Sequence, residues 1–77
     1  MKKFFDVHVF HSRKNGFSVP VVMDDQIDDT IDINDIPDEQ VIQKAVDNDQ
    51  IDTEDAEAVD YVEEINEEDF VAMGGKL

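Results

Sequence analysis

Acidic residues alternate with branched apolar residues along most of this chain, and this interleaving limits the structures that the chain can form. Of the 21 aspartates and glutamates in the 77 residues, all but Asp6 lie after residue 23. Segments that stay disordered are poor in apolar residues, whereas 40% of this chain is hydrophobic. The stretch that begins at Asp24, DDQIDDTIDINDIPDEQ, places an isoleucine after every few acids. We therefore expect an ordered domain that carries its carboxylates on the surface.

Charge divides the chain into two unequal parts. Residues 1–23 hold four basic residues and one acid, a formal charge of +3, whereas residues 24–77 hold two lysines and 20 acids, a formal charge of -18. The net charge of -15 lies far outside the roughly 2 to 8 units that keep a small domain soluble. The excess of carboxylates therefore indicates a function beyond solubility.

The length of the chain predicts a single domain over residues 1–77, which buries only about 60% of the surface of its unfolded form. A large catalytic cleft is not expected at this size. The absence of cysteine excludes disulfides and fits a reducing cell interior. The apolar start MKKFF is interrupted before the roughly 7 to 15 residues of a signal peptide, and no run reaches the roughly 20 residues of a membrane span. A soluble cytoplasmic protein without membrane contact is expected.

Two alternating apolar runs, FFDVHVFH and FSVPVVMDD, flank the turn cluster SRKNG and predict a β-hairpin. If residues 14–16 form a three-residue loop, Arg13 lies opposite Phe17. A two-residue turn would instead set Phe10 beside Val21, and the sequence leaves both registers open. The first register predicts one apolar face made of Phe5, Val7, Val9, Val19, Val21 and Met23.

The second half of the chain predicts two helices and one strand. Pro37 suits the first turn of a helix, in which Asp38 and Glu39 complement the helix dipole. The segment IDTEDAEAVDYVEEI favours a strand in which Val59, Tyr61 and Ile65 alternate with acids, although a helical spacing also fits it. Asn66 can cap a short helix that Gly74 and Gly75 end, with Phe70 and Met73 turned inward.

The fold class expected from these elements is α+β. A small antiparallel sheet, made of the N-terminal hairpin and a third strand, packs with one main helix and a short C-terminal helix. Pro20 cannot donate a ladder hydrogen bond, so we expect its strand at a sheet edge or with that position facing away from its neighbour. The expected segments are a hairpin at 1–26, an acidic loop at 27–36, a helix at 37–48, a strand at 57–65 and a short helix at 66–73.

No catalytic, metal or cofactor site is expected. His8 and His11 point to opposite faces of a strand and cannot chelate one ion together. An EF-hand loop that starts at Asp28 would place Ile33 at the sixth position, where glycine makes the sharp turn. Glycoside hydrolysis by paired carboxylates needs a cleft that raises one pKa by burial, which a chain of this size hardly provides. The chain is therefore not expected to be an enzyme.

The number of carboxylates suggests imitation of a phosphate backbone. B-DNA carries one phosphate per about 1.7 Å of axis, so a globule roughly 25 Å across would lie alongside about 15 phosphates. An ordered row of carboxylates can occupy the lysine and arginine sites that a nucleic-acid-binding protein uses for phosphate. The isoleucines at positions 27, 31, 33 and 36 are expected to hold the acidic loop in place. The candidate partner-binding residues are Asp24, Asp25, Asp28, Asp29, Asp32, Asp35, Asp52, Glu54, Asp55, Glu57, Asp60, Glu63, Glu64, Glu67, Glu68 and Asp69.

In size, acidity, lack of cysteine and mixed α/β patterning, the whole chain resembles the small acidic DNA-mimic proteins of phages and mobile elements. The run AVDYVEEINEEDF, after a hairpin and an IQKAV helix, also looks like small phage proteins with a hairpin-helix-strand order. The resemblance implies an anti-CRISPR or anti-restriction inhibitor in the cytoplasm of an infected bacterial cell. Its partner would be a DNA-binding defence protein, with no direct binding of nucleic acid and with room for a homodimer that extends the charged surface.

The basic hairpin departs from a uniformly acidic mimic and supports a second hypothesis. In this alternative the chain is a protein-protein interaction module that binds through an exposed hairpin edge or through Phe4, Phe10 and Phe17. Its acids would then serve solubility or steering.

Overall fold

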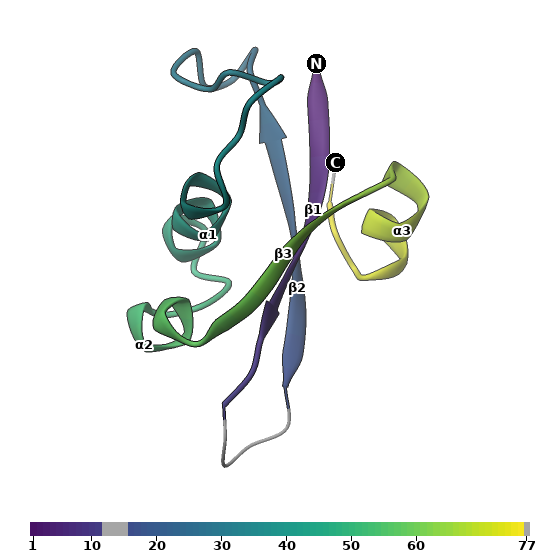
Figure 1. Ribbon diagram of the computed structural model, residues 1–77. Helices are drawn as coiled ribbons and strands as arrows, with labels where there is room; N and C mark the ends of the chain where they lie inside the picture. Colours follow the sequence, from purple (N-terminus) through teal and green to yellow (C-terminus); the bar gives the residue numbers. More distant parts are fainter. Residues whose placement is uncertain (12–15, 77) are drawn as a thin grey trace.

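A three-stranded antiparallel sheet with strand order β2-β1-β3 forms the centre of the molecule. The computed structural model describes residues 1–11 and 16–76. The α+β fold that the sequence predicts, a hairpin and a third strand with one longer and one short C-terminal helix, is confirmed. Figure 1 shows the sheet nearly edge-on, with α1 and α2 on one side and α3 on the other. The elements are β1 (Lys2–Val9), β2 (Phe17–Asp24), α1 (Asp38–Asp47), α2 (Thr53–Glu57), β3 (Val59–Ile65) and α3 (Glu67–Ala72).

The hairpin has a register that neither sequence prediction gave. Val9 lies opposite Phe17 and Phe5 lies opposite Val21, so the predictions that placed Arg13 opposite Phe17 or Phe10 beside Val21 are wrong. The turn on which both rested includes residues 14 and 15, which lie outside the described residues. The observed register differs from the first prediction by four residues, an even number that leaves the same side chains inward. The predicted apolar face is therefore correct, with Val19 half-buried and its other five members buried.

Helix α1 covers this apolar face. It begins after Pro37, which is the N-cap and not, as predicted, part of the first turn. Its buried residues are Val41 and Ala45, spaced by four on the side that meets the sheet. The main core cluster consists of Phe5, Val7, Val9, Val21, Met23, Ile31, Val41, Ala45 and Ile51.

The third strand is shorter than predicted and interrupted by a bulge. It begins at Val59 and not at residue 57, because residues 53–57 form α2, a helix that the sequence analysis missed. The pairing shifts between His8 and Val9, so that Tyr61 lies opposite His8 but Val59 lies opposite Val9. This extra residue moves Val59 to the α1 side of the sheet and Tyr61 to the other side. The predicted common face of Val59 and Tyr61 is therefore wrong, and Tyr61 is 45% exposed.

Helix α3 covers one end of the second face of the sheet. The Phe70 ring is 2% exposed and lies 4.8 Å from the Phe4 ring, measured between centroids. As predicted, the Asn66 side chain caps the helix by accepting a hydrogen bond from the Asp69 amide at 2.8 Å. Gly74, with φ +90°, follows the helix in a conformation that glycine adopts readily. The remainder of this face has no helix over it (Figure 1).

Candidate functional site

The acidic stretch between β2 and α1 is folded by its own aspartates. Three carboxylates at intervals of four residues each accept a hydrogen bond from the backbone amide two positions later. The pairs are Asp24 with Gln26 at 2.9 Å, Asp28 with Thr30 at 3.0 Å and Asp32 with Asn34 at 3.1 Å. Short polar side chains favour such turns because they imitate a backbone carbonyl. The sequence analysis missed this repeat, although its signal, an aspartate at every fourth position, is visible in the sequence.

Asp28 accepts a second hydrogen bond within its turn. The Thr30 hydroxyl donates to the same carboxylate oxygen at 2.6 Å. The two hydrogen bonds from Thr30, the hydroxyl first and the amide second, hold the pKa of Asp28 below its ordinary value of 3.8. Asp28 therefore stays ionised and keeps its turn closed throughout the physiological pH range.

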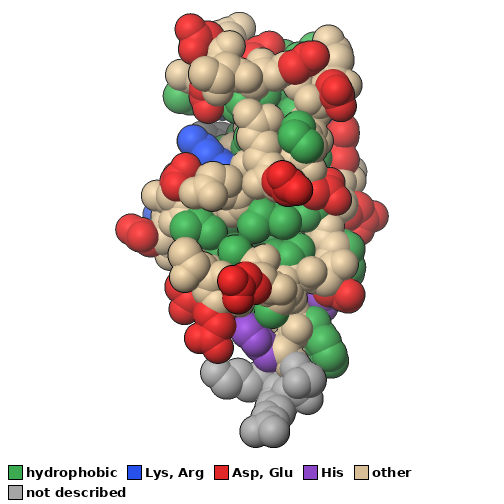
Figure 2. Space-filling model, turned by 60° about the vertical axis from the view of Figure 1, so that its left-hand side comes forward, with side chains coloured by type: hydrophobic (Ala, Val, Ile, Leu, Met, Phe, Trp, Pro, Cys, Tyr) green, Lys and Arg blue, Asp and Glu red, His purple; other side chains and the backbone are tan. Residues whose placement is uncertain are grey.

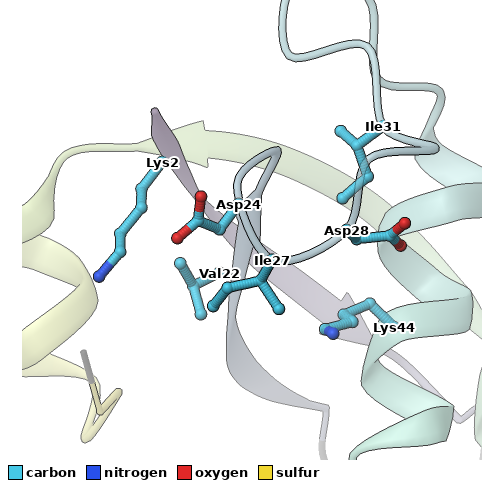
Figure 3. Close-up of a pocket in the computed structure, with 7 residues that line it drawn as sticks. All are labelled: Lys2, Val22, Asp24, Ile27, Asp28, Ile31 and Lys44. Carbon is cyan, nitrogen blue, oxygen red and sulfur yellow. The ribbon is translucent and has the colours of Figure 1, made fainter.

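The isoleucines fix the acidic loop to the body as expected, with one exception. Ile31 and Ile33 are buried and Ile36 is half-buried, but Ile27 is 80% exposed. The prediction that Ile27 anchors the loop is therefore wrong. It lines a small hollow of about 100 Å³ where the loop meets β2 and α1 (Figure 3). Lys44 lines the same hollow and adds a smaller effect that also lowers the pKa of Asp28.

Helix α2 uses two of the candidate carboxylates to cap itself. Asp52 accepts a hydrogen bond from the Asp55 amide at 2.8 Å, and Asp55 accepts one from the Asp52 amide at 3.3 Å, which makes a reciprocal capping box. Asp55 also forms a hydrogen bond with Nε2 of His11 at 2.8 Å. This bond to His11 is the main reason that the pKa of Asp55 is lowered from 3.8. The two aspartates therefore have a structural role, whereas Glu54 and Glu57 are exposed.

A second series of carboxylates follows the edge of the sheet from α2 through β3 to α3. We call it the acidic edge and define it as Glu57, Asp60, Glu63, Glu64, Glu67 and Glu68. All six are exposed. Glu57 ends α2, Asp60, Glu63 and Glu64 lie in β3, and Glu67 and Glu68 begin α3; β3 runs from α2 on one side of the sheet to α3 on the other (Figure 1). Glu64 lies 3.5 Å from the ammonium group of Lys3. The glutamates at the start of α3 also stabilise its N-terminal end through the helix dipole.

The sixteen candidate residues divide into a bonded group and a free group. Seven accept hydrogen bonds or form ion pairs within the protein. They are Asp24, Asp25, Asp28, Asp32, Asp52, Asp55 and Glu64. The other nine are exposed, and their side chains have no hydrogen bond or ion pair to another described residue. They are Asp29, Asp35, Glu54, Glu57, Asp60, Glu63, Glu67, Glu68 and Asp69.

The structure does not collect the candidate residues into one uninterrupted row. In the view of Figure 2, the carboxylates are spread over the visible face with hydrophobic and backbone surface between them. The acidic loop and the acidic edge are separate features. The loop leads into α1 on one side of the sheet, whereas the acidic edge follows β3 to α3 on the other side (Figure 1). The molecule is 38 Å long, a length of B-DNA that carries about 22 phosphates. The net charge of -15 is therefore about two thirds of the charge of the DNA phosphates along this length. The sequence analysis had predicted equal charges.

The aromatic residues of the hairpin differ in their availability. Phe4 packs against Phe70, so it is not free to bind a partner as the alternative hypothesis assumed. Phe10 and Phe17 are 55% and 39% exposed. His8 stacks on Tyr61 with centroids 4.9 Å apart. The exposed phenylalanines of the hairpin therefore lie at one end of it, where β1 ends and β2 begins.

Other kinds of site find little support in the described part of the chain. Within residues 1–11 and 16–76, no three histidine or carboxylate side chains are grouped to hold a metal ion. A hollow of about 550 Å³ lies beside the outer edge of β2, and its described lining includes no acid and no histidine. No described helix is both long enough and apolar enough to cross a membrane.

Comparisons with protein-family models, curated proteins and solved structures gave no match for this chain.

Proposed function

We propose that this protein is a DNA-mimicking inhibitor that binds the positively charged nucleic-acid site of a bacterial defence protein, such as a CRISPR nuclease or a restriction enzyme, and blocks DNA binding. It acts without catalysis or a cofactor, in the cytoplasm of the infected or host cell. The observation that carries this proposal is the ordered presentation of nine exposed carboxylates that have no partner among the described residues.

Order matters because a rigid charged surface loses less conformational entropy on binding than a flexible tail. The three aspartate turns and the buried isoleucines fix the backbone of the acidic loop. The strand and helices fix the acidic edge in the same way. Carboxylates held in this manner can form charge-assisted hydrogen bonds with lysine and arginine side chains that otherwise hold phosphates.

The mechanism is competition for the basic site. The field of a molecule with net charge -15 steers it toward a basic channel and raises the association rate at low salt. Once bound, the inhibitor excludes DNA from the same channel. Affinity should fall steeply with salt concentration, and DNA that is already bound should protect the target.

The first experiment is a tagged pull-down from bacterial lysate at low salt, with bound proteins identified by mass spectrometry. It is repeated with excess duplex DNA and after nuclease treatment of the lysate. A DNA-binding enzyme that added DNA displaces, and that nuclease treatment leaves bound, supports mimicry and identifies the target. A partner that is indifferent to DNA contradicts it.

A paired charge reversal then tests which carboxylates act. Asp28 and Asp32 are unsuitable because their side chains close turns, so the loop variant changes Asp29→Lys and Asp35→Lys. The control changes Glu39→Lys and Asp47→Lys on exposed positions of α1, with the same change in net charge. Because the two variants have the same net charge, they differ only in the position of the changes. We expect the loop variant to bind the captured enzyme about tenfold or more weakly than the control. Equal affinities for the two variants would contradict a role for the acidic loop.

The alternative, an interaction module that uses the hairpin, is favoured by the exposure of Phe10 and Phe17. In that case Phe10→Ser and Phe17→Ser would abolish capture, whereas the charge reversals would change it little. The pull-down decides between the two functions, because a hairpin partner would stay bound in the presence of DNA.

A further inference from the structure

The two outer strands of the sheet differ in whether they can accept another strand. On β2, the backbone carbonyl of Pro20 accepts a hydrogen bond from the side chain of Gln50, which comes from outside the sheet. The Pro20 position therefore faces outward, and proline has no N–H to offer there. With its carbonyl occupied and its donor missing, the middle of the β2 edge is closed to strand addition.

The same bond fixes which backbone groups of the other strands face outward. Backbone groups alternate in direction along an antiparallel strand. Because Pro20 faces away from β1, its opposite residue Asp6 faces β3. The amide of Phe10, also at an even position, donates to the carbonyl of Ala58 on the β3 side at 3.0 Å, which agrees with this direction.

The outward groups of β3 follow from its pairing with β1. Glu63 lies opposite Asp6 and Tyr61 lies opposite His8, so these residues face β1. The N–H and C=O groups of Val62 and Glu64 then point outward. Among the described residues, no backbone or side-chain group forms a hydrogen bond with them. In Figure 1, β3 is drawn in front of β1 and β2 with no ribbon across it.

The side chains around this open edge create a negative field. Glu64 flanks Val62 on the α1 side of the sheet, whereas Glu63 lies on the other side, opposite Asp6. One carboxylate oxygen of Asp6 is buried without a hydrogen-bond partner among the described residues. Desolvation raises the pKa of the nearby Tyr61 phenol, and the charges of Asp6, Glu63 and Asp60 raise it further. A cation placed at this edge would therefore meet carboxylates on either face of the sheet.

We propose that the outer edge of β3 binds an extended, lysine- or arginine-rich segment of the partner protein by strand addition. The segment forms main-chain hydrogen bonds with Val62 and Glu64, and its basic side chains reach Glu63 on one face and Glu64 on the other. This inference rests on the proposed function, since it describes how the same basic partner is held.

Charge also selects against a second copy of this chain at the edge. Two β3 strands paired with each other would bring the acidic positions of both edges together, and like charges that face each other across strands are destabilising. A basic segment removes this repulsion and gains the same main-chain hydrogen bonds. Charge complementarity therefore favours a basic strand over a second copy.

The first test uses two synthetic peptides with the full-length protein at low salt. One is an octapeptide of alternating lysine and threonine, and the other has the same sequence with N-methyl groups on its four central residues. The methyl groups remove the N–H donors on both edges of the peptide, hinder the close approach of a neighbouring strand and leave the charge unchanged. We expect the unmodified peptide to bind about tenfold or more tightly and to slow the amide hydrogen exchange of Val62 and Glu64. Equal binding of the two peptides would overturn the proposal.

A pair of variants tests the edge from the protein side. Glu64→Pro removes the outward N–H in the way that Pro20 does on β2, whereas Glu64→Gln removes only the charge. Both lose the ion pair with Lys3 and the same charge, so the comparison removes the contribution of the carboxylate and leaves the effect of placing proline at this edge. We expect the proline variant to bind the unmodified peptide at least about fivefold more weakly than the glutamine variant. If the proline variant does not fold, the peptide comparison on the unchanged protein still decides.

The outcomes separate this inference from the proposed function. If DNA displaces the captured enzyme but both peptides bind equally, mimicry stands and strand addition is wrong. If the peptide protects Val62 and Glu64 but DNA displaces no partner, strand addition stands and mimicry is wrong. Protection of Val62 that grows with protein concentration in the absence of peptide would assign the edge to a second copy and overturn the proposal.

Discussion

At the scale of single residues, the aspartates of the acidic stretch have two different roles. Asp24, Asp28 and Asp32 accept backbone hydrogen bonds and close turns, whereas Asp29 and Asp35 point into solvent without such bonds to described residues. The first group gives the loop its shape, and the second group is available to a partner. The difference comes from position within the turn, since only the first residue of each turn can reach the amide two positions later.

The turn at Asp28 makes a testable contribution to stability as a function of pH. Because its pKa is lowered from 3.8 in the folded protein, ionised Asp28 stabilises the fold above that pH, and the contribution is lost as the pH falls through the folded pKa. Thr30→Val removes the hydroxyl donor, so we expect the pKa of Asp28 to rise toward 3.8. The variant should be less stable than the wild type at about pH 7, and this difference should shrink when the pH is lowered below 3.8 and through the folded pKa.

The measurement is an NMR titration of the Asp28 carboxyl carbon, combined with chemical unfolding at both pH values. Thr30→Ser keeps the hydroxyl and serves as the control, with a pKa close to that of the wild type. A pKa that does not change in Thr30→Val would show that the hydroxyl bond is absent in solution.

At the scale of the elements, local caps decide where the short helices lie. Helix α2 has five residues and none of them is buried, so packing alone does not explain it. The capping box of Asp52 and Asp55 satisfies amides that would otherwise lack partners at its start. Helix α3 combines a cap at Asn66 with the burial of Phe70 against the second sheet face, which ties it to the sheet more firmly.

Removal of the α2 cap should destabilise the protein by a predictable amount. Asp52→Ala is expected to lower the free energy of unfolding by about 0.5 to 2 kcal/mol, the usual effect of losing an N-cap. Glu54→Ala removes the same charge from an exposed position and should have a much smaller effect. Urea denaturation of the three proteins measures the difference, and equal losses in both variants would argue against the capping box.

At the scale of the whole molecule, the charge that suits a basic partner works against folding. Carboxylates surround a body of 38 by 25 by 19 Å, and a net charge far from zero destabilises compact states by self-repulsion. The core opposes this with one main cluster between the sheet and α1. A basic partner would relieve this repulsion. Binding of the partner should therefore raise the stability of the folded protein.

Salt should therefore stabilise the free protein. The Debye length falls from about 30 Å at 0.01 M to about 8 Å at 0.15 M ionic strength, so distant carboxylates stop repelling one another. We expect the Tm to rise by several degrees over this range, since about 1 kcal/mol shifts the Tm of a domain of this size by about 4 to 8 °C.

Thermal scans in sodium chloride measure the effect, and calcium chloride at equal ionic strength is the comparison. The Asp29→Lys and Asp35→Lys variant, with less negative charge, should show a weaker dependence on sodium chloride. A Tm that falls with added salt would contradict net repulsion. A saturating rise at low calcium concentration would indicate a specific cation site instead.

The sequence predicted the parts of the fold that depend on short-range pattern. Alternation over FFDVHVF and FSVPVVM identified the inward face of the hairpin. The Asn66 cap and the glycines after α3 were also read correctly. These features were predictable because each is determined by neighbours within about one turn or one strand.

Of the candidate site, the sequence alone supplied the set of carboxylates, their large excess and their interleaving with isoleucine. The local turns of Asp24, Asp28 and Asp32 could have been predicted from the sequence. The hydrogen bond of Asp55 with His11 and the ion pair of Glu64 with Lys3 could not, because they join residues far apart in the chain. Nor could the sequence choose the hairpin register, since a shift by an even number of residues leaves the same side chains inward.

The tertiary structure alone decided which strand edge is open. Proline lacks the N–H in any fold, but the carbonyl of Pro20 is occupied only because Gln50, thirty residues later in the chain, reaches it. The β3 edge stays open because no described group forms a hydrogen bond with the outward backbone groups of Val62 and Glu64. The bulge after His8, which turns Tyr61 to the second face, likewise exists only in the pairing of β1 with β3. Local pattern thus determined which residues face inward and how much charge the surface carries. Long-range pairing decided the partners of Asp25, Asp55 and Glu64, and where the backbone can still form hydrogen bonds.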